Sequence, residues 1–303
     1  MQLPTTRQLQ AFLAVADAAS FRIAAEVCEI SQPALSQLIQ GLETGLGTQL
    51  FERDSKGVRL THAGRKFQKA IAPGMVQLGN IVTTLHAEEG FLPPKIRVGI
   101  IPTIAPYLLP GFLPRLTAHF PETRVVVQEG QTGDIVARTI AGELDFVILA
   151  LEGELGNLEL QKFGFEPFFL LTQRGHPLSA GKTVNQGALS EEQVLLLEDG
   201  HCLSETTLAL CQDIRPNELG DFRASALTTL VKLVEAGHGV TILPQMAVSS
   251  EINSHPNLIA TRFENPKVGR ALGVAWRRSS PFADQWKEVA AVLSQMMQGG
   301  EFV

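Results

Sequence analysis

Apolar residues recur at helical spacing in the first part of the chain. One helix is predicted over residues 5–17, with apolar positions at Leu9, Phe12, Leu13 and Ala16. A second, shorter helix is predicted after Ser20, over about residues 21–28. A third helix is predicted to begin at Ser31 or Gln32, since a polar residue can cap it and Pro33 is tolerated in a first turn. The apolar stripe of this third helix consists of Leu35, Leu38, Ile39 and Leu42.

The segment after the third helix alternates polar and apolar residues, which is typical of a β-hairpin. We expect two strands within residues 50–61, on either side of a turn at residues 54–57. In the second strand, Arg59 alternates with Val58 and Leu60, so its side chain is expected on the opposite face. Together with Arg53 on the first strand, it would give this wing two positive charges.

A long helix is predicted over about residues 61–89. Its apolar residues are spaced by three or four positions, at Phe67, Ile71, Met75, Leu78, Val82 and Leu85. A stripe with this spacing needs a partner helix, so we expect a dimerisation helix. Packing on residues 5–17 of the same chain is the alternative. Pro73-Gly74 lies inside this segment and predicts a kink or a break.

Beyond Pro93-Pro94, predicted strands and helices alternate, which indicates βαβ units with a parallel sheet. The first strands are expected at residues 96–101, 124–128 and 145–149, with helices at 107–119 and 134–141. After Pro167, further strands are expected at 168–171, 194–197 and 240–243, a helix at 227–236, and a return to the first lobe near 269–278. Two lobes joined in this way form a cleft, which is the usual place for a ligand.

The composition is that of an ordinary globular protein. The 303 residues are 45% hydrophobic and 18% charged, which excludes disordered, collagenous and purely coiled-coil proteins. The sequence contains no apolar run long enough to span a membrane, and its N-terminus lacks the basic and apolar segments of a secretion signal. Three cysteines are too few for a secreted disulfide scaffold, so we expect a cytoplasmic protein.

A net charge of −6 at first argues against a protein that binds nucleic acid. The acidic residues, however, are concentrated outside residues 1–66, where seven Lys or Arg balance six Asp or Glu. In this segment the third helix would present small polar groups to base edges in a major groove, and the wing would bind phosphates. The candidate DNA-binding residues are Ser31, Gln32, Pro33, Ser36, Gln37, Arg53 and Arg59. The alternative is an amphipathic helix of a bundle beside two solvated arginines.

Cys202 follows a predicted strand and loop and directly precedes a plausible helix start. Unpaired N–H groups at a helix N-terminus stabilise a thiolate. Glu198 and Asp199 act against this stabilisation, so a reactive thiolate would need a nearby cation. Cys28 is expected to be a small core residue.

Cys211 lies nine positions after Cys202, about 13.5 Å along a helix, whereas a disulfide needs Cα atoms within about 7 Å. The two cysteines could therefore bridge only if the segment unwinds, as in a redox switch. A peroxide would oxidise the Cys202 thiolate to sulfenic acid, which Cys211 would resolve. The alternative is a pair of inert core cysteines, and no convincing set of metal ligands stands beside them.

Several motifs of residues 5–66 resemble those of LysR-type transcription regulators. They are Ser20-Phe21-Arg22-Ile23-Ala24-Ala25, Ser31-Gln32-Pro33-Ala34-Leu35-Ser36, Leu42-Glu43, Leu46-Gly47, Leu50-Phe51-Glu52-Arg53 and Leu60-Thr61-His62-Ala63-Gly64. The resemblance implies an α/β fold class. A winged helix-turn-helix domain (residues 1–66) and a long linker helix (67–91) would precede a two-lobed, periplasmic-binding-protein-like regulatory domain (92–303). Lobe I would span about 92–165 and 269–303, and lobe II about 166–268. Residues 237–244 agree with such a domain.

Other motifs are similar to those of the hydrogen-peroxide-sensing members of this family. They are Ile100-Ile101-Pro102-Thr103, Pro106-Tyr107-Leu108-Leu109-Pro110, Leu197-Glu198-Asp199-Gly200-His201-Cys202-Leu203 and Phe222-Arg223-Ala224-Ser225. This resemblance implies that Cys202 is the peroxide-reactive cysteine and Cys211 the resolving one. Thr103, Thr132, His201 and Arg270 match the residues around the reactive thiol. Arg270 would supply the missing positive charge, and Thr103 would orient the peroxide.

The resemblance implies an activator of oxidative-stress genes that acts as a homotetramer, a dimer of dimers. Its partners would be promoter DNA, hydrogen peroxide, RNA polymerase and a thiol reductant of the glutaredoxin or thioredoxin type, with no cofactor, metal or membrane. Two alternatives stay open. One is a LysR-type regulator that binds a small organic effector in the interlobe cleft, and the other is a thiol peroxidase enzyme.

Overall fold

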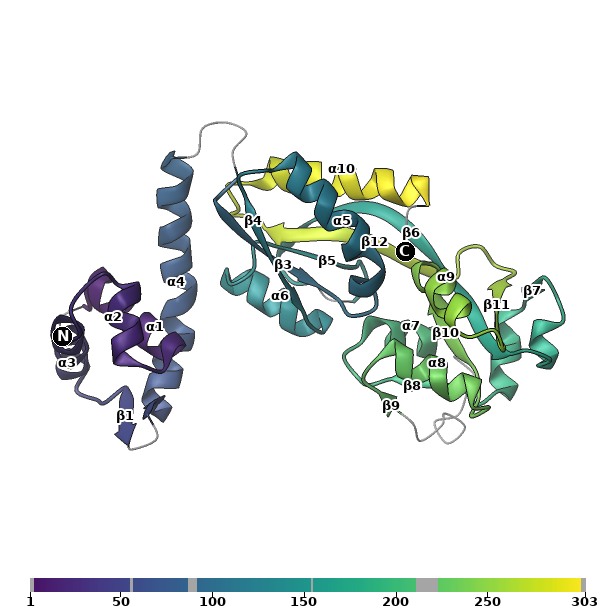
Figure 1. Ribbon diagram of the computed structural model, residues 1–303, viewed down its shortest axis with the longest axis horizontal. Helices are drawn as coiled ribbons and strands as arrows, with labels where there is room; N and C mark the ends of the chain where they lie inside the picture. Colours follow the sequence, from purple (N-terminus) through teal and green to yellow (C-terminus); the bar gives the residue numbers. More distant parts are fainter. Residues whose placement is uncertain (1–2, 55–56, 87–91, 154, 211–222, 301–303) are drawn as a thin grey trace. The chain divides into compact units, whose positions relative to one another are not determined.

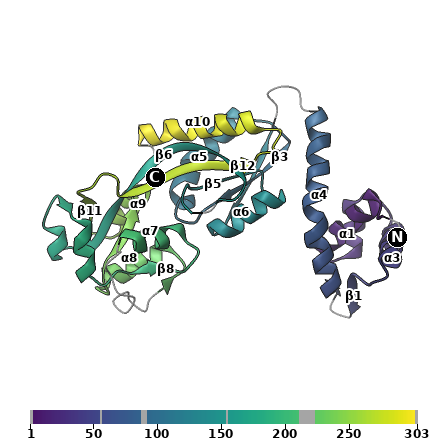
Figure 2. The ribbon, with the colours of Figure 1, turned by 180° about the vertical axis from the view of Figure 1, so that it is seen from behind.

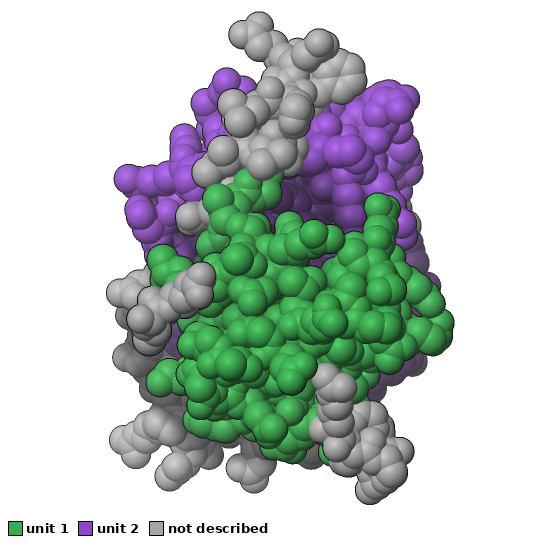
Figure 3. All heavy atoms as spheres, turned by 90° about the vertical axis from the view of Figure 1, so that its left-hand side faces the viewer, with its two compact units in different colours: residues 1–86 green, residues 87–303 purple. Residues whose placement is uncertain are grey.

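The computed structural model describes residues 3–300, except for 55–56, 87–91, 154 and 211–222. The chain divides into two compact units, Met1–His86 and Ala87–Val303, which are coloured separately in Figure 3. Each unit has its own hydrophobic core.

The first unit is a small helical domain with a two-stranded wing. Ser20 and Ser31 cap the N-termini of the second and third helices through their side chains, which fixes where each helix begins. The Phe12 ring packs against Phe51 in a tilted arrangement and against Phe67 edge-on, with centroids 5.1 Å apart in both pairs. The elements are α1 (Thr6–Ala18), α2 (Phe21–Val27), α3 (Gln32–Leu46), β1 (Phe51–Asp54), β2 (Gly57–Leu60) and α4 (His62–His86). The three predicted helices and the hairpin are therefore confirmed.

The expected break at Pro73-Gly74 is wrong, because α4 continues through Pro73 as one helix. Proline removes a single amide donor from the helix, and the remaining hydrogen bonds on both sides carry the helix past it. Cys28 does not lie within the second helix but caps its C-terminus, and it is half-buried against the core.

The second unit is built on a mixed sheet whose order is β4-β3-β5-β12-β6-β11-β7, with β10 also paired to β6. In its first half, which we call lobe I, α5 and α10 lie on one face of the sheet and α6 lies on the other (Figures 1 and 2). The elements of lobe I are β3 (Lys95–Ile100), α5 (Ala105–His119), β4 (Arg124–Glu129), α6 (Thr132–Ala141), β5 (Phe146–Ala150), β12 (Gly269–Arg277) and α10 (Ala283–Gly299).

The other half, which we call lobe II, is entered through a long strand, β6 (Leu158–Gln173). The first part of β6 pairs with β12 up to Pro167, and the rest pairs with β10 and β11 from Phe168 onward. The remaining elements are η1 (Pro177–Ser179), β7 (Thr183–Val184), η2 (Gln186–Glu191), β8 (Leu196–Leu197), α7 (Cys202–Leu210), β9 (Arg223–Ala224), α8 (Leu227–Glu235), β10 (Thr241–Pro244), α9 (Gln245–Ser254) and β11 (Leu258–Phe263).

Two expectations about this sheet need correction. The expected parallel pairing holds for β3 with β4 and with β5, and β11 also pairs in parallel with β7. Strands β6 and β12, however, pair antiparallel to each other and to their other neighbours. The strand expected at residues 168–171 begins ten residues earlier, at Leu158. Glu159, Lys162 and Glu166 interrupt the apolar pattern there, so it gave no clear strand signal. The predicted return to the first lobe is β12.

Candidate functional site

Cys202 is the first residue of α7, and its side chain is buried. The loop that delivers it turns at Gly200, whose φ of 91° lies in the left-handed region that favours glycine. A Cβ atom at Gly200 would come within 2.6 Å of the Gln131 side chain, so this loop packs closely against lobe I. The Gln131 amide also donates to the Asp199 carbonyl (3.4 Å). The thiol therefore lies where the loop of lobe II meets the start of α6.

A buried cation stands beside this thiol. Arg270, at the start of β12, is 1% exposed and donates through Nε to the Glu166 carboxylate (2.8 Å). Its Nη1 and Nη2 atoms donate to the hydroxyl (2.7 Å) and the carbonyl (3.1 Å) of Thr103. The other carboxylate oxygen of Glu166 accepts from the Met246 amide at the start of α9 (2.8 Å). Arg270 is thus held in one orientation by lobe I and by the strand that the lobes share.

Two threonines complete the surroundings of the thiol. Thr103 is buried and accepts from Arg270, which leaves its own hydroxyl proton available as a donor. Thr132 is the first residue of α6. Its hydroxyl oxygen is buried without a conventional hydrogen bond to any group in the described ranges, although it lies near enough to Cys202 to favour the thiolate. Two polar groups can therefore bind a small oxygen-containing molecule next to Cys202.

Opposing influences act on the pKa of Cys202. Burial has the largest effect and raises the pKa of the thiol, because a thiolate is poorly solvated there. The positive charge of Arg270 lowers this pKa, the negative charge of Glu152 raises it, and the Thr132 hydroxyl lowers it. The net pKa is higher than the ordinary value of a thiol. The cation expected from the sequence is present, yet burial has a larger effect on the pKa of Cys202 than Arg270 does.

His201 is also buried, directly before Cys202. Burial lowers the pKa of its ring and the charge of Glu198 partly opposes this, so the neutral imidazole is favoured. Within the described residues, the ring takes part in no hydrogen bond with Thr103, Thr132 or Arg270. Cys211 lies outside the described residues. The structure therefore brings together Cys202, Thr103, Thr132 and Arg270. His201 adjoins this group as the residue before Cys202.

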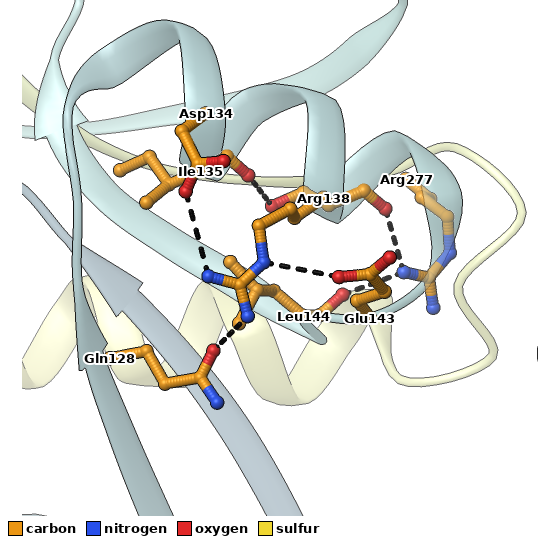
Figure 4. Close-up of polar contacts among 8 residues, drawn as sticks. Gln128, Asp134, Ile135, Arg138, Glu143, Leu144 and Arg277 are labelled. Atoms are coloured by element: carbon orange, nitrogen blue, oxygen red, sulfur yellow. Dashed lines mark hydrogen bonds and ion pairs between the residues drawn. The ribbon is translucent and has the colours of Figure 1, made fainter. Parts of the chain in front are cut away.

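Helix α6, which presents Thr132, is fixed at its opposite end by two arginines (Figure 4). Arg138 contacts Gln128 of β4, donates to Glu143 (3.1 Å) and forms an ion pair with Asp134 (3.5 Å). Arg277 of β12 donates to the Thr139 carbonyl in the last turn of α6 (2.9 Å) and to the Leu144 carbonyl in the segment that follows the helix (2.7 Å). The position of Thr132 is therefore coupled to the sheet.

The described residues include no group of three His, Cys, Asp or Glu side chains placed to hold a metal ion. None of the helices in the described ranges is both long enough and apolar enough to span a membrane.

Comparison with known proteins places this geometry in a family. Residues 6–65 match the model of the lysR family of bacterial regulatory helix-turn-helix proteins, and residues 90–298 match the LysR substrate binding domain. The chain belongs to the LysR family. Within this family, it is 34% identical over 295 residues to the "DNA-binding transcriptional dual regulator OxyR" of Escherichia coli, covering 97% of this chain and 96% of the relative.

Further relatives belong to the same branch of the LysR family. A "Probable hydrogen peroxide-inducible genes activator" of Streptomyces viridosporus is 36% identical and covers 97% of this chain and 95% of its own length. A full-length OxyR variant from Pseudomonas aeruginosa is 30% identical, covers 97% of this chain and 98% of that one, and gives a TM-score of 0.78. A hydrogen-peroxide-bound OxyR cysteine mutant from Corynebacterium glutamicum gives a TM-score of 0.67 at 34% identity, with 98% and 94% covered. The chain is an OxyR-type member of the LysR family, a family of regulators rather than enzymes.

In the LysR helix-turn-helix unit, the predicted DNA-binding residues lie on an outer surface. Ser31, Gln32, Pro33 and Gln37 are exposed and Ser36 is half-exposed, whereas Leu35 and Ile39 on the opposite side of α3 are buried. Arg59 is exposed on β2. Arg53 lies on β1 in register with Val58, and its side chain is not among those that the structure describes. The Ser31 hydroxyl accepts from the Ala34 amide, so this residue also caps α3.

Three acidic residues in the surroundings of Cys202 and Arg270 were not predicted from the sequence. Glu166 holds Arg270, Glu152 contacts α7, and Glu251 accepts from the buried Tyr107 hydroxyl (2.8 Å). Burial and the negative charge of Glu251 together raise the pKa of Tyr107, which therefore stays a neutral donor. Glu166 could have been found, because it precedes Pro167 within an apolar run where a carboxylate needs a partner. Nothing in the sequence distinguishes Glu152 or Glu251 from surface residues.

Proposed function

We propose that this chain is a transcription regulator that senses hydrogen peroxide through oxidation of Cys202. One observation carries the proposal: the buried Cys202 thiol at the start of α7 faces Arg270, which is held in place by Glu166 and Thr103. The OxyR-type relatives, some of them named for hydrogen peroxide, support the same sensing role. We also propose that the two halves of the mixed sheet are the lobes of the regulatory domain, with the boundaries predicted from the sequence.

The first chemical step is a two-electron oxidation of the sulfur. The Cys202 thiol first loses its proton; the thiolate then attacks one peroxide oxygen, the O–O bond breaks, and the leaving hydroxide takes up the released proton to form water. The product is a sulfenic acid. Arg270 stabilises the thiolate, while Thr103 and Thr132 hydrogen-bond the peroxide and the leaving oxygen.

The second step would form a disulfide with Cys211. The Cys211 sulfur attacks the Cys202 sulfur, an S–S bond forms, and the sulfenic hydroxyl leaves as water. Overall, two thiols and one hydrogen peroxide give one disulfide and two waters. Helix α7 from Cys202 to Leu210 rises by about 12 Å, so it must unwind before its two ends can be bridged.

Unwinding of α7 would then change the packing of the regulatory domain and the way paired helix-turn-helix units bind a promoter. In this proposal the regulator is a cytoplasmic homotetramer, a dimer of dimers, that contacts DNA through α3 and the β1–β2 wing. It would recruit RNA polymerase, activate oxidative-stress genes, and be reset by a thiol reductant of the glutaredoxin or thioredoxin type.

The test compares Cys202→Ser with Cys28→Ser, which removes a half-buried thiol of the DNA-binding unit. Footprints on promoter DNA and peptide maps are recorded before and after one equivalent of hydrogen peroxide. We expect the Cys28 variant to shift its footprint and form the Cys202–Cys211 disulfide, and the Cys202 variant to do neither. A peroxide response in Cys202→Ser would disprove the assignment of the sensor.

Two further outcomes of the same test would also disprove the proposal. An unchanged wild-type thiol content after peroxide would point to a small organic effector in the interlobe cleft. Sustained turnover of peroxide with a reductant would point to a thiol peroxidase.

A further inference from the structure

A carboxylate of lobe I contacts the helix that carries the sensor cysteine. Glu152 follows β5 in the loop after Leu151, and its Oε2 atom accepts a hydrogen bond from the Thr206 hydroxyl on α7. The same hydroxyl lies 2.8 Å from the Cys202 carbonyl, one helical turn earlier. Thr206 therefore joins the first turn of α7 to a strand end of the other lobe.

We propose that Glu152 is a positioning residue that, through Thr206, holds α7 in its helical form and thereby limits how readily Cys202 is converted to the disulfide. The inference rests on the proposed sensing reaction, since α7 must unwind for Cys202 and Cys211 to meet. Unwinding separates Thr206 from Glu152, so the reduced form keeps this hydrogen bond and the oxidised form loses it. The bond consequently favours the reduced form at equilibrium.

The local structure of α7 makes this contact important. The helix has nine residues, which is short for an independent helix, and contains the adjacent residues Thr206 and Thr207. The Thr207 hydroxyl donates to the Leu203 carbonyl, and the Thr206 hydroxyl shares its one proton between Glu152 and the Cys202 carbonyl. Such bonds to carbonyls four residues earlier compete with regular helical hydrogen bonding. Ser204 also donates to the Leu197 carbonyl (2.9 Å), within lobe II. Besides the contacts of Cys202 itself with Arg270 and Thr132, the Glu152–Thr206 hydrogen bond joins α7 to lobe I.

The charge of Glu152 has a second effect on the same reaction. The charged groups that act on the thiol are Arg270 of β12 and Glu152, and Glu166 in turn pairs with Arg270. Glu152 raises the pKa of Cys202, and it also raises that of Arg270. A carboxylate at this position therefore lowers the fraction of Cys202 that is thiolate and, by binding Thr206, opposes disulfide formation. Both effects raise the peroxide concentration needed for a response.

The experiment separates the hydrogen bond from the charge in the full-length chain. Thr206→Val keeps the branched shape and the helix propensity but cannot bind Glu152. Thr207→Val is the matched control, because it removes the same kind of bond to a carbonyl, on the same helix, without a link to lobe I. The measured quantity is the equilibrium between the dithiol and the Cys202–Cys211 disulfide in glutathione buffers, read by peptide mapping.

We expect Thr206→Val to raise the equilibrium constant for disulfide formation about three- to tenfold over Thr207→Val, which is roughly 15–30 mV in reduction potential. Thr206→Ser, which restores a hydroxyl, should return the constant to within about twofold of the wild type. Equal constants in the two valine variants would overturn the proposal. If the wild type forms no Cys202–Cys211 disulfide at all, the sensing function itself fails, which is a different result.

Glu152→Gln provides a readout that a purely structural role would not change. Its amide oxygen can still accept from Thr206, but the negative charge is gone. The midpoint of the pH profile for alkylation of Cys202 should therefore move to lower pH, whereas Thr206→Val should leave that midpoint in place. An unchanged midpoint in Glu152→Gln would show that the carboxylate does not act on the thiol.

Discussion

Arg270 and Glu166 form a buried ion pair with almost no contact to water, at 0% and 1% side-chain exposure. Such pairs contribute little to net stability, since the cost of removing two charges from water nearly offsets their attraction. Removing one partner is different, because the other charge is then left buried. The pair therefore serves to fix a cation beside Cys202, and the Phe168 ring, 5.9 Å from the guanidinium carbon, packs against it.

The first prediction concerns this pair. Arg270→Met leaves the Glu166 carboxylate buried and uncompensated, so it should destabilise the reduced protein by about 3–5 kcal/mol. The double variant Arg270→Met with Glu166→Gln should recover most of that loss, because neither charge remains. Urea unfolding of the reduced proteins measures both effects. Equal destabilisation in the single and the double variant would contradict the coupling.

The reactivity of both variants is informative as well. Each lacks the cation beside Cys202, so each should react more slowly with hydrogen peroxide than the wild type at neutral pH. A double variant that is stable but still reacts at the wild-type rate would show that Arg270 is not needed to stabilise the thiolate.

The raised pKa of Cys202 leads to a second prediction at this scale. The thiolate is the reactive form, and its fraction grows about tenfold per pH unit below the pKa. Because the folded pKa is above the ordinary value, the peroxide rate should still be rising at pH values where an exposed thiol has reached its plateau. Stopped-flow rates over a series of pH values, with cysteine-containing peptide as the reference, test this. A plateau at lower pH than the peptide would contradict it.

At the scale of elements, α7 combines a reactive residue with a short and weakly supported helix. Cys202, Leu203 and Ser204 at its start are buried, whereas its outer face is exposed at Glu205 and Ala209. Helical stability in so short a segment comes mostly from tertiary contacts rather than from propensity. Small changes in helix propensity should therefore change the balance between the dithiol and disulfide forms.

A substitution on the exposed face of α7 tests this directly. Ala209→Gly costs a helix about 1 kcal/mol, so it should raise the equilibrium constant for disulfide formation about fivefold. Ala291→Gly, on the exposed face of the long helix α10, is the matched control and should leave that constant unchanged. Equal constants in the two variants would mean that α7 does not unwind on oxidation.

The helix-turn-helix unit leads to a separate prediction for α3 and the wing. Arg59→Ala should weaken binding uniformly across DNA sequences and reduce the slope of log affinity against log salt by about 1, as expected for a phosphate contact. Gln37→Ala should instead cost about 1–3 kcal/mol at one base position and relax the preference there. Titrations of matched and altered operators at several salt concentrations distinguish these outcomes. A sequence-dependent loss in Arg59→Ala would reverse the two roles.

At the scale of the whole molecule, local features could be predicted from the sequence and distant pairings could not. The helices of the first unit follow from caps and apolar spacing, and they formed as expected at Ser20 and Ser31. The resemblance to known regulators pointed to Arg270 as a neighbour of the thiol, which the structure places there. It did not point to Glu166, which lies 104 positions away in the chain and meets Arg270 only through the pairing of β6 with β12.

The position of β6 also explains why its first half was not predicted. Lys162 is exposed, Glu159 is partly exposed and Glu166 pairs with Arg270 of β12, so the strand does not have a continuous apolar pattern. The strand pairs with β10, β11 and β12, which come much later in the chain. This pairing is set by the topology of the sheet rather than by the local sequence.

The 16 residues of β6 form one continuous strand through both halves of the regulatory unit. Arg270 and Glu166 lie next to the position where the partner strand of β6 changes from β12 to β10 and β11. A continuous hydrogen-bonded strand resists bending. The two halves of the sheet are therefore not expected to rotate toward each other when the thiol is oxidised. Within one chain, the change of backbone should instead be concentrated in α7 and its loop, and the altered packing should arise where this segment meets neighbouring parts of the regulator, with the sheet left rigid. Hydrogen exchange before and after oxidation should show amides of α7 losing protection while those of β6 keep theirs. Uniform loss of protection along β6 would indicate a hinged molecule instead.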